Sequence, residues 1–303
     1  GVELVGVVDP GGDPHQAASD IPLFASLDEL VSLGIDYAVV SIPTAHHLVA
    51  GVALAGAGIH CLIEKPVADS AESAQALVNA FENAGLVGAV GHIERYNPAL
   101  QHARARLANG ELGEVYQIVT RRQGPFPGRI SDVGVVKDLG THDIDLTAWV
   151  TQRAYRSVSA HIPHRSGRDH EDLVAVVGEL EGGVVANHLV NWLSPLKERI
   201  TVITGERGTL VADTLTADLT LYENGTVVSE WSALASFRGV TEGNMVRFAI
   251  SKPEPLRTEH EAFRDAILGR PADIVTLEQG LRTVRVAEAV LESARTGNSL
   301  AID

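Results

Sequence analysis

The 303-residue sequence predicts an α/β domain with a doubly wound parallel sheet, followed by an α+β domain with a large, mostly antiparallel open sheet covered by helices. Short apolar runs alternate with helical patterns up to about residue 90, as in parallel strands joined by crossover helices. Beyond that point the strand patterns alternate between apolar and polar residues, which is typical of an antiparallel sheet with one solvated face. No flexible linker separates the two patterns, so we expect closely packed domains at residues 1–94 and 95–303.

The elements of the first domain follow from apolar runs and from helix-capping residues. Ser26 suits an N-cap with Asp28 and Glu29 in the first turn, and Gly58 and Gly85 each suit the end of a helix. The strands are nearly continuously apolar, which is the pattern of strands covered on both faces. The expected strands are 2–8, 37–42, 59–63 and 86–90, and the expected helices are 24–33, 46–57 and 70–84.

The second domain begins with a helix over 97–109, which Gly110 follows. A helix over 133–150 interrupts the strands, and helices over 260–268 and 277–296 close the chain. The expected strands are 115–122, 157–164, 172–180, 184–192, 199–204, 208–213 and 218–222.

Charge and composition restrict the partners. The chain is 45% hydrophobic and 21% charged, with a net charge of −15 and a sequence pI of about 5.2. An acidic surface disfavours nucleic acid and anionic membranes, and no apolar run approaches the ~20 residues of a membrane span. Cys61 is the only cysteine, and its place in an apolar strand suits a small core residue better than a nucleophile. We expect a soluble cytoplasmic protein.

The histidines do not suggest a metal site. His46 and His47 are adjacent and cannot chelate from one helix face, and His161 and His164 flank a proline in a strand-like stretch. No thiol pair exists, and no Gly-x-Ser-x-Gly elbow supports a serine hydrolase. We therefore expect no metal.

Glu64-Lys65-Pro66 is the first candidate cluster, and it closes the buried strand 59–63. The carboxyl ends of parallel strands are where open α/β sheets hold their ligands. Lys65 could be an ordinary surface lysine, but its position favours a fixed cation that stabilises a developing alkoxide. Glu64 could position Lys65, line a cofactor pocket or be merely structural.

Asp138 and His142 form the second candidate cluster. Their i, i+4 spacing places both on one helix face, as a general base with its orienting carboxylate requires. An imidazole near its ordinary pKa of ~6.5 is suited to accept the proton of an alcohol. From spacing alone a core histidine is the better interpretation, and the Asp138 partner is what favours a catalytic role. Asp145 could be the partner instead or a solvated residue.

Three motifs in this order resemble the Gfo/Idh/MocA oxidoreductases over nearly the whole chain. They are Glu64-Lys65-Pro66, Gly91-His-Ile-Glu-Arg-Tyr-Asn-Pro98 and Asp138-x-x-x-His142-x-x-Asp145. The ending, Glu259 to Phe263 and Glu292 to Gly297, also resembles the last helices of that family. The segment from Arg121 to His142 is most similar to members that oxidise nucleotide-diphosphate sugars, such as UDP-N-acetylglucosamine 3-dehydrogenases, and inositol 2-dehydrogenases are similar as well.

The resemblance implies a Rossmann-like first domain and an NAD(P)-dependent dehydrogenase acting on a secondary alcohol of a sugar, cyclitol or nucleotide-diphosphate sugar. His142 would take the hydroxyl proton, Lys65 would polarise the oxygen, and hydride would pass to the nicotinamide. The cofactor would meet Ser41, Pro43, Thr44 and His47, the turn after strand 37–42, and Glu64, Lys65 and a cis Pro66. Thr44 has a second interpretation as a helix N-cap.

Asp9 ends the first strand, where the resemblance places an acidic residue on the adenosine ribose. Its charge would repel a 2′-phosphate, so NAD is favoured over NADP. A strand-ending turn with Pro10 is the alternative role.

Substrate binding is expected at the start of the second domain and in a basic loop. Arg95, Tyr96 and Asn97 either contact substrate or cap and pack the helix that follows. Arg122 and Arg129, together with Arg121, form a basic patch that suits a phosphate-bearing substrate, and a solvated loop is the alternative.

The Gly-x-Gly-x-x-Gly turn that opens such domains does not occur in these residues. We therefore expect an N-terminally incomplete form of a longer protein, in which strand 2–8 corresponds to the second strand of the fold. Otherwise the strands that flank the gap close up directly, or another chain fills it. The runner-up function follows from this gap: a cofactor-deficient binding or assembly module of the same fold. An open antiparallel sheet also predicts a homo-oligomer, a dimer or tetramer.

Overall fold

The computed structural model describes all residues except 14–15, 17, 19, 129–132, 226–240 and 303. The chain divides into unit 1, Gly1–Gly91 with Glu259–Val284, and unit 2, His92–Thr258 with Arg285–Asp303. The change after Gly91 lies close to the expected boundary at residue 94. The segment Glu259–Val284 differs from the expectation, because it clusters with the first unit rather than with the second.

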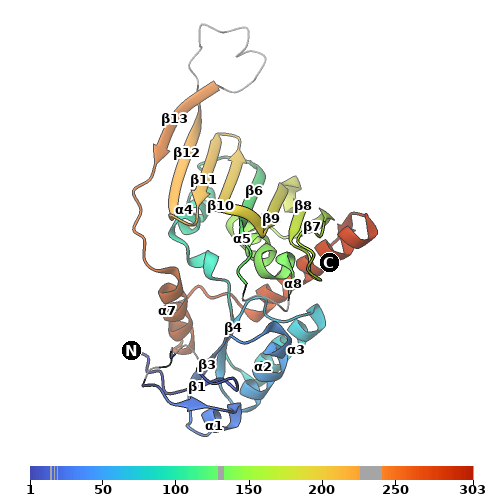
Figure 1. Cartoon of the computed structure of the whole chain (residues 1–303). Helices are drawn as coiled ribbons and strands as arrows, with labels where there is room; N and C mark the ends of the chain where they lie inside the picture. The colour runs from blue at the N-terminus through green and yellow to red at the C-terminus, as the bar shows by residue number, and fades with distance from the viewer. Residues whose placement is uncertain (14–15, 17, 19, 129–132, 226–240, 303) are drawn as a thin grey trace. The chain divides into compact units, whose positions relative to one another are not determined.

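Unit 1 is built on a parallel sheet in the order β3 (Tyr37–Val40), β4 (His60–Glu64) and β5 (Gly88–Gly91) (Figure 1). Its register pairs Val40 with Ile63 and Glu64 with Gly91. Other elements of this unit are α1 (Leu27–Val31), the 3-10 helix η1 (Thr44–His46), α2 (His47–Gly56), α3 (Ala71–Ala84), most of α7 (Pro255–Ile267) and the first part of α8 (Leu277–Thr296).

Both faces of β4 are buried, which explains its continuous apolar sequence. Cys61 and Ile63 pack in a core with side chains of α2 and α3. Leu62 packs in a separate cluster with Ala89 of β5 and Phe263 of α7. Helix α7 thus helps to cover the second face of this sheet, which is why it clusters with unit 1. The doubly wound arrangement predicted from the sequence is confirmed.

A separate parallel pair, β1 (Val7–Val8) with β2 (Leu23–Phe24), lies in the same unit. Within the described residues β1 pairs with β2 alone and β3 pairs with β4 alone, so each keeps one open edge. The alternative in which the strands flanking the gap close up directly is therefore wrong. The strand expected over 2–8 is only two residues long, because it has a ladder partner on one side and Val2 and Leu4 remain exposed.

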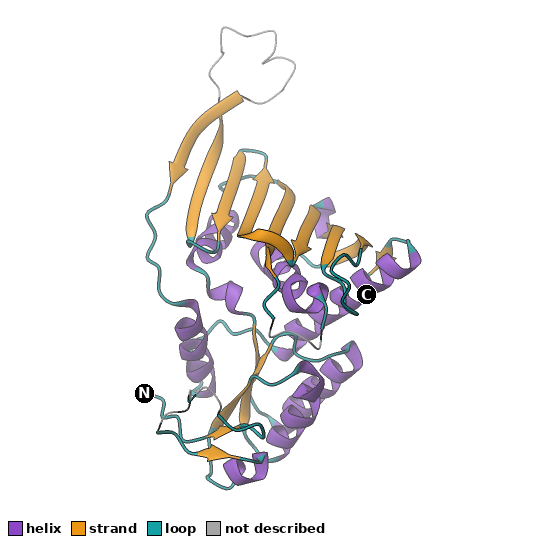
Figure 2. Ribbon diagram, in the orientation of Figure 1, coloured by secondary structure: helices purple, strands orange, loops and turns teal. Residues whose placement is uncertain are grey.

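Unit 2 centres on a sheet of nine strands in the order β13-β12-β11-β10-β6-β9-β8-β7-β14, which Figure 2 shows as a continuous row of arrows. All neighbouring strands in the described residues are antiparallel except β6 and β9, which are parallel. The strands are β6 (Val115–Pro125), β7 (Tyr155–His161), β8 (Leu173–Leu180), β9 (Val185–Asn191), β10 (Leu193–Gly205), β11 (Gly208–Asp213), β12 (Asp218–Gly225), β13 (Thr241–Arg247) and β14 (Leu300–Ala301).

Helices of unit 2 cover one face of this sheet, with α4 (Pro98–Ala108) and α5 (Thr141–Thr151) packed on it (Figure 1). The 3-10 helices η2 (Ile93–Tyr96) and η4 (Glu181–Gly183) and the π-helical turn η3 (Val136–Gly140) complete the unit with the rest of α8. The opposite face carries exposed Val177, Val185 and Leu189, which the register places on one side of β8 and β9. None of the helices in the described part of the chain combines the length and apolar character needed to cross a bilayer.

Candidate functional site

The carboxyl ends of β3, β4 and β5 lie along one edge of the parallel sheet of unit 1. Ser41 follows β3, and Lys65 follows β4. This is the edge at which parallel α/β sheets bind ligands. Within unit 1, the candidate site is therefore the edge that carries Lys65.

The Lys65-Pro66 peptide is cis, as the resemblance implied. The buried ring of His47 contacts its neighbourhood from α2: Nδ1 lies 3.0 Å from the carbonyl oxygen of Pro66, and Nε2 lies 2.9 Å from the carbonyl oxygen of Ile42. Both ring nitrogens thus face backbone carbonyls in the segments that follow β3 and β4; a neutral imidazole donates to one of the two, and the tautomer decides which. His47 is built as a brace for Lys65-Pro66, a role that spacing alone did not indicate.

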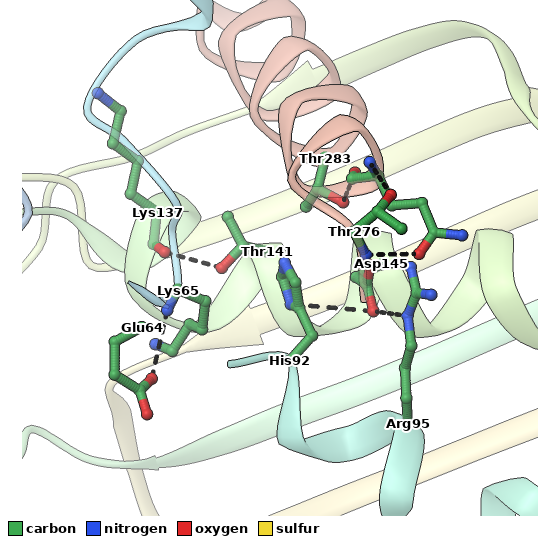
Figure 3. A network of polar contacts seen from close by, with 10 residues as sticks. Glu64, Lys65, His92, Arg95, Lys137, Thr141, Asp145, Thr276 and Thr283 are labelled. Carbon is green, nitrogen blue, oxygen red and sulfur yellow. Dashed lines mark hydrogen bonds and ion pairs between the residues drawn. The ribbon is translucent and has the colours of Figure 1, made fainter. Parts of the chain in front are cut away.

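The carboxylate of Glu64 lies against the backbone beside Lys65. Its Oε2 accepts the backbone N–H of Lys65 at 3.2 Å (Figure 3). A Cβ added to Gly91 would lie 3.0 Å from the Glu64 carboxyl carbon, so a larger residue there would push this side chain from its place. Glu64 therefore holds the Lys65 backbone, in line with the positioning role considered from the sequence.

The remaining sequence candidates in unit 1 occupy the turns after β1 and β3. Ser41 and Pro43 are exposed, whereas Thr44 is buried. The N-cap interpretation of Thr44 is wrong, because Thr44 is the first residue of η1 and Pro43 occupies the cap position. Asp9 is exposed, and its Oδ1 accepts the N–H of Gly11 at 2.8 Å, so it forms the turn that was considered as its alternative role.

In unit 2, Asp138 and His142 lie on either side of a change in helix type. The helix expected over 133–150 is not a single α-helix: η3 is π-helical and carries Asp138, and α5 then carries His142. The N–H of Thr141 bonds to the carbonyl of Val136, five residues back, and its hydroxyl donates to the carbonyl of Lys137 at 2.9 Å (Figure 3). Such π turns are rare and often mark functional sites. Asp138 is buried and His142 is half-buried.

Two of the arginines expected to bind substrate are held in buried ion pairs of unit 2. Arg122 on β6 donates from Nε to Asp143 at 2.9 Å and from Nη1 to Glu94 at 2.9 Å. Burial opposes the charge of this guanidinium, but Asp143 and Glu94 outweigh burial, so the pKa of Arg122 is raised. With its side chain 3% exposed, Arg122 is positioned to hold the fold together rather than to reach a substrate phosphate.

Arg95 forms a bidentate pair with Asp145, at 2.8 Å from Nε and 2.7 Å from Nη2 (Figure 3). Nδ1 of His92 lies 3.8 Å from the same carboxylate. All three residues are buried, so the interpretation of Asp145 as a solvated residue is wrong. His92 is part of one of the three sequence motifs, but no role was assigned to it from the sequence.

Tyr96 and Asn97 are also buried. Oδ1 of Asn97 accepts the N–H of Ala99 at 3.0 Å, so Asn97 caps α4. Capping was one of the two roles considered for this residue from the sequence. Arg129 lies outside the described residues.

Arg199 of β10 is the partly exposed arginine beside this buried network. Its Nη1 lies 3.6 Å from Oε1 of Glu94, and its side chain is 32% exposed. Burial and the nearby charge of Arg122 lower its pKa, whereas Glu94, Asp143 and Asp138 act in the opposite direction. Asp138 therefore belongs to the same charged neighbourhood. No sequence pattern marked Arg199 beyond its place in a predicted strand.

Comparison with known proteins identifies the family. Residues 1–92 match the oxidoreductase family with an NAD-binding Rossmann fold, and residues 100–211 match the GFO/IDH/MocA C-terminal domain. The chain belongs to the Gfo/Idh/MocA oxidoreductase family. The expectation drawn from the three motifs is thereby confirmed.

Individual relatives give the same result. The UDP-N-acetylglucosamine 3-dehydrogenase of Acidithiobacillus ferrooxidans is 32% identical over 188 residues, 61% of this chain and 58% of that protein, so the match spans little more than half of this relative. Inositol 2-dehydrogenase 2 of Saccharopolyspora erythraea is 26% identical over 89% of this chain and 77% of that protein. A solved structure of the A. ferrooxidans enzyme is similar with a TM-score of 0.82 at 26% identity, over 96% of this chain and 90% of that chain.

Among the described residues, no three His, Cys, Asp or Glu side chains gather in a way that could hold a metal ion.

The buried pairs of Arg122 provide the first testable prediction. Arg122→Met removes the countercharge of two buried carboxylates, so we expect the free energy of unfolding to fall by about 3–5 kcal/mol. Arg156→Met is the matched control, because its pair with Glu181 is largely exposed, and it should cost less than about 1 kcal/mol. Urea unfolding measures both. Equal losses for the two variants would contradict the buried network.

Proposed function

We propose that this protein is an NAD-dependent dehydrogenase that oxidises a secondary alcohol of a sugar, cyclitol or nucleotide-diphosphate sugar. The observation that carries the proposal is the braced Lys65-Pro66 segment at the carboxyl end of β4, held by Glu64 and His47. A cation aimed by two backbone contacts suits the stabilisation of charge that develops during reaction. Membership of the oxidoreductase family supports the reaction class.

His142 is proposed as the general base and Lys65 as the group that polarises the alcohol oxygen. His142 sits directly after the π turn that carries Asp138, and the carboxylate of Asp138 would stabilise the charged form of the imidazole. Loss of the hydroxyl proton makes the carbinol carbon a hydride donor. Asp138 is proposed as a positioning residue for His142.

The residues at the strand ends fit part of a nicotinamide dinucleotide. Exposed Asp9 at the end of β1 could receive ribose hydroxyls, and exposed Ser41 and Pro43 with Lys65 could border the nicotinamide. When bound, the cofactor would supply hydride acceptance. His47 and Thr44 are buried and would support this surface rather than touch the cofactor.

The substrate class is proposed from relatives and from charge. One relative is a UDP-N-acetylglucosamine 3-dehydrogenase and another an inositol 2-dehydrogenase. Because Arg95 and Arg122 are held by buried carboxylates, Arg199 takes their place as the proposed donor to a substrate. Its partial exposure and its proximity to Asp138 support this choice.

A cofactor-deficient binding or assembly module remains the second candidate function. Within the described residues β1 and β3 each keep an open edge, which favours this candidate because an open strand edge can pair with another chain. The braced Lys65 favours the dehydrogenase, because a non-catalytic module would not need a positioned cation.

Replacing either proposed catalytic residue tests the dehydrogenase directly. Lys65→Met and His142→Gln should each lower the turnover of NAD⁺ reduction by about 10²–10⁴-fold, because a fixed cation or a general base contributes that much. UDP-N-acetylglucosamine and myo-inositol are the substrates to assay, by absorbance of NADH. Exposed Lys197→Met and His102→Gln are matched controls that should retain full turnover. Near-normal rates in the first pair would refute the assignment.

Cofactor titration separates the two candidate functions. A dehydrogenase should give saturable NADH fluorescence and bind NADPH more weakly, because the Asp9 carboxylate repels a 2′-phosphate. Asp9→Ala should remove this preference, whereas Asp36→Ala, also exposed in unit 1, should preserve it. No saturable signal for either nucleotide would favour the binding module.

The apolar outer face of the nine-stranded sheet supports a proposed homo-oligomer. Val177→Glu combined with Leu189→Glu places two charges on this face and should shift the protein to monomers in sedimentation velocity. Leu268→Glu, at an exposed position after α7, is the control and should leave the assembly intact. A wild-type protein that sediments as a monomer at micromolar concentration would contradict the proposed homo-oligomer.

A further inference from the structure

Glu259 is a buried acid on α7 with no assigned role. Its residue is 1% exposed, and its Oε1 is buried without a hydrogen-bond partner. An ionised carboxylate in such a position is costly, so the group must either meet a countercharge or carry a proton. The charged group that acts on it is another acid, Glu64.

Packing of α7 on the sheet explains why these two acids meet. Phe263 packs against Leu62 of β4 and Ala89 of β5, and its ring meets Tyr37 edge-on at a centroid distance of 5.4 Å. Glu259 lies one helical turn before Phe263 and so on the same face of α7. The helix thus presents Glu259 beside the carboxyl end of β4, two residues beyond Leu62.

Glu64 in turn contacts the backbone of Lys65. Its Oε2 accepts the Lys65 N–H at 3.2 Å (Figure 3). Its carboxyl group also occupies the space that a side chain at position 91 would need. A change in the charge or position of Glu64 is therefore felt at the Lys65 backbone.

We propose that Glu259 is a positioning residue for Lys65: it presents a neutral carboxyl group to the carboxylate of Glu64, which holds the Lys65 backbone. The purpose of this arrangement, an aimed Lys65 ammonium, rests on the proposed dehydrogenase function. The coupling between the two acids does not, because it can be measured without cofactor or substrate.

The protonation behaviour of Glu259 agrees with this geometry. Burial, and then the charge of Glu64, raise its pKa to about 8. Of the other titratable groups on the strands beneath α7, Tyr37 of β3 is influenced by Arg264, and β5 carries none. His60, at the start of β4, accepts the N–H of Val87. A carboxyl group with a raised pKa favours the folded state at low pH. That contribution is lost as pH rises from the unfolded pKa of ~4.3 to about 8, above which two like charges face each other.

The first experiment measures the coupling itself. The chain is labelled with ¹³C at the glutamate carboxyl carbons, and the Glu259 resonance is assigned as the one missing from Glu259→Gln. We expect this resonance to titrate above pH 7 in the wild type and lower in Glu64→Gln. Titration near pH 4.5, or no change in Glu64→Gln, overturns the proposal.

The second experiment measures the effect on Lys65. Hydrogen–deuterium exchange gives the protection of the Lys65 amide, with the Cys61 amide of the same strand, bonded to Val87, as an internal reference. Glu259→Leu should lower Lys65 protection about tenfold, the equivalent of one hydrogen bond. Glu259→Gln should restore it, because a neutral amide keeps a donor facing Glu64.

The pH profile completes this test. In the wild type, Lys65 protection should fall as pH passes 8, and in Glu259→Gln it should not. Glu261→Gln, two residues further along α7, is the matched control and should resemble the wild type. Equal loss of protection at Lys65 and Cys61 in Glu259→Leu, without rescue by Gln, would show a general structural role and overturn the proposal.

The two proposals fail separately. If the carboxyl titration and the Lys65 protection behave as expected while Lys65→Met retains turnover, the acid pair stands and the dehydrogenase role of Lys65 falls. If Lys65→Met abolishes turnover while Glu259 titrates as an ordinary acid, the catalytic role stands and the inference about Glu259 falls.

Discussion

The parallel register of β3, β4 and β5 is the constraint on which the candidate site of unit 1 depends. Parallel strands end at the same edge, so pairing of Glu64 with Gly91 places the carboxyl ends of β4 and β5 side by side. Because β4 is packed on both faces, its end is held in place, and the backbone of Lys65, the next residue, is held with it. Glu64 and His47 then need to brace only one peptide segment, on either side of Lys65.

Unit 2 fixes its candidate residues by charge instead. The pair of Arg95 with Asp145 ties α5 to η2, and the pair of Arg122 with Asp143 ties α5 to β6. His142 lies on the same helix as both carboxylates, one residue before Asp143. Buried ion pairs often add little net stability, but each contact here has a defined geometry that a hydrophobic substitute would not impose. The network therefore orients the helix that carries the proposed base.

Local patterns predicted much of the fold, and long-range contacts explain what they missed. Alternation alone located β11 at its observed bounds, and the apolar run of β4 indicated cover on both faces. The partners of Arg122 lie 21 and 28 residues away in the sequence, so no spacing rule could separate a buried ion pair from a substrate-binding cation. The π turn before His142 was missed for a similar reason, because an i, i+4 pattern does not reveal an extra residue in one turn. The cover of the first sheet by α7 comes from almost two hundred residues downstream of β4, and it brought Glu259 to Glu64 without any local signal.

The two units solve the problem of buried charge in opposite ways, and their responses to pH should differ accordingly. In unit 2 the carboxylates Glu94 and Asp143 share Arg122, whose pKa is raised, so that network keeps its countercharge throughout the neutral and mildly alkaline range. In unit 1 Glu259 meets another acid, and the pKa of about 8 means that this acid pair changes charge just above neutrality. Ionisation of Glu259 would therefore act at the end of β4, next to Lys65. Oxidation of an alcohol by NAD⁺ releases a proton, so a rising pH favours this direction of the proposed reaction. Ionisation of Glu259 near Lys65 would oppose that advantage above a pH of about 8.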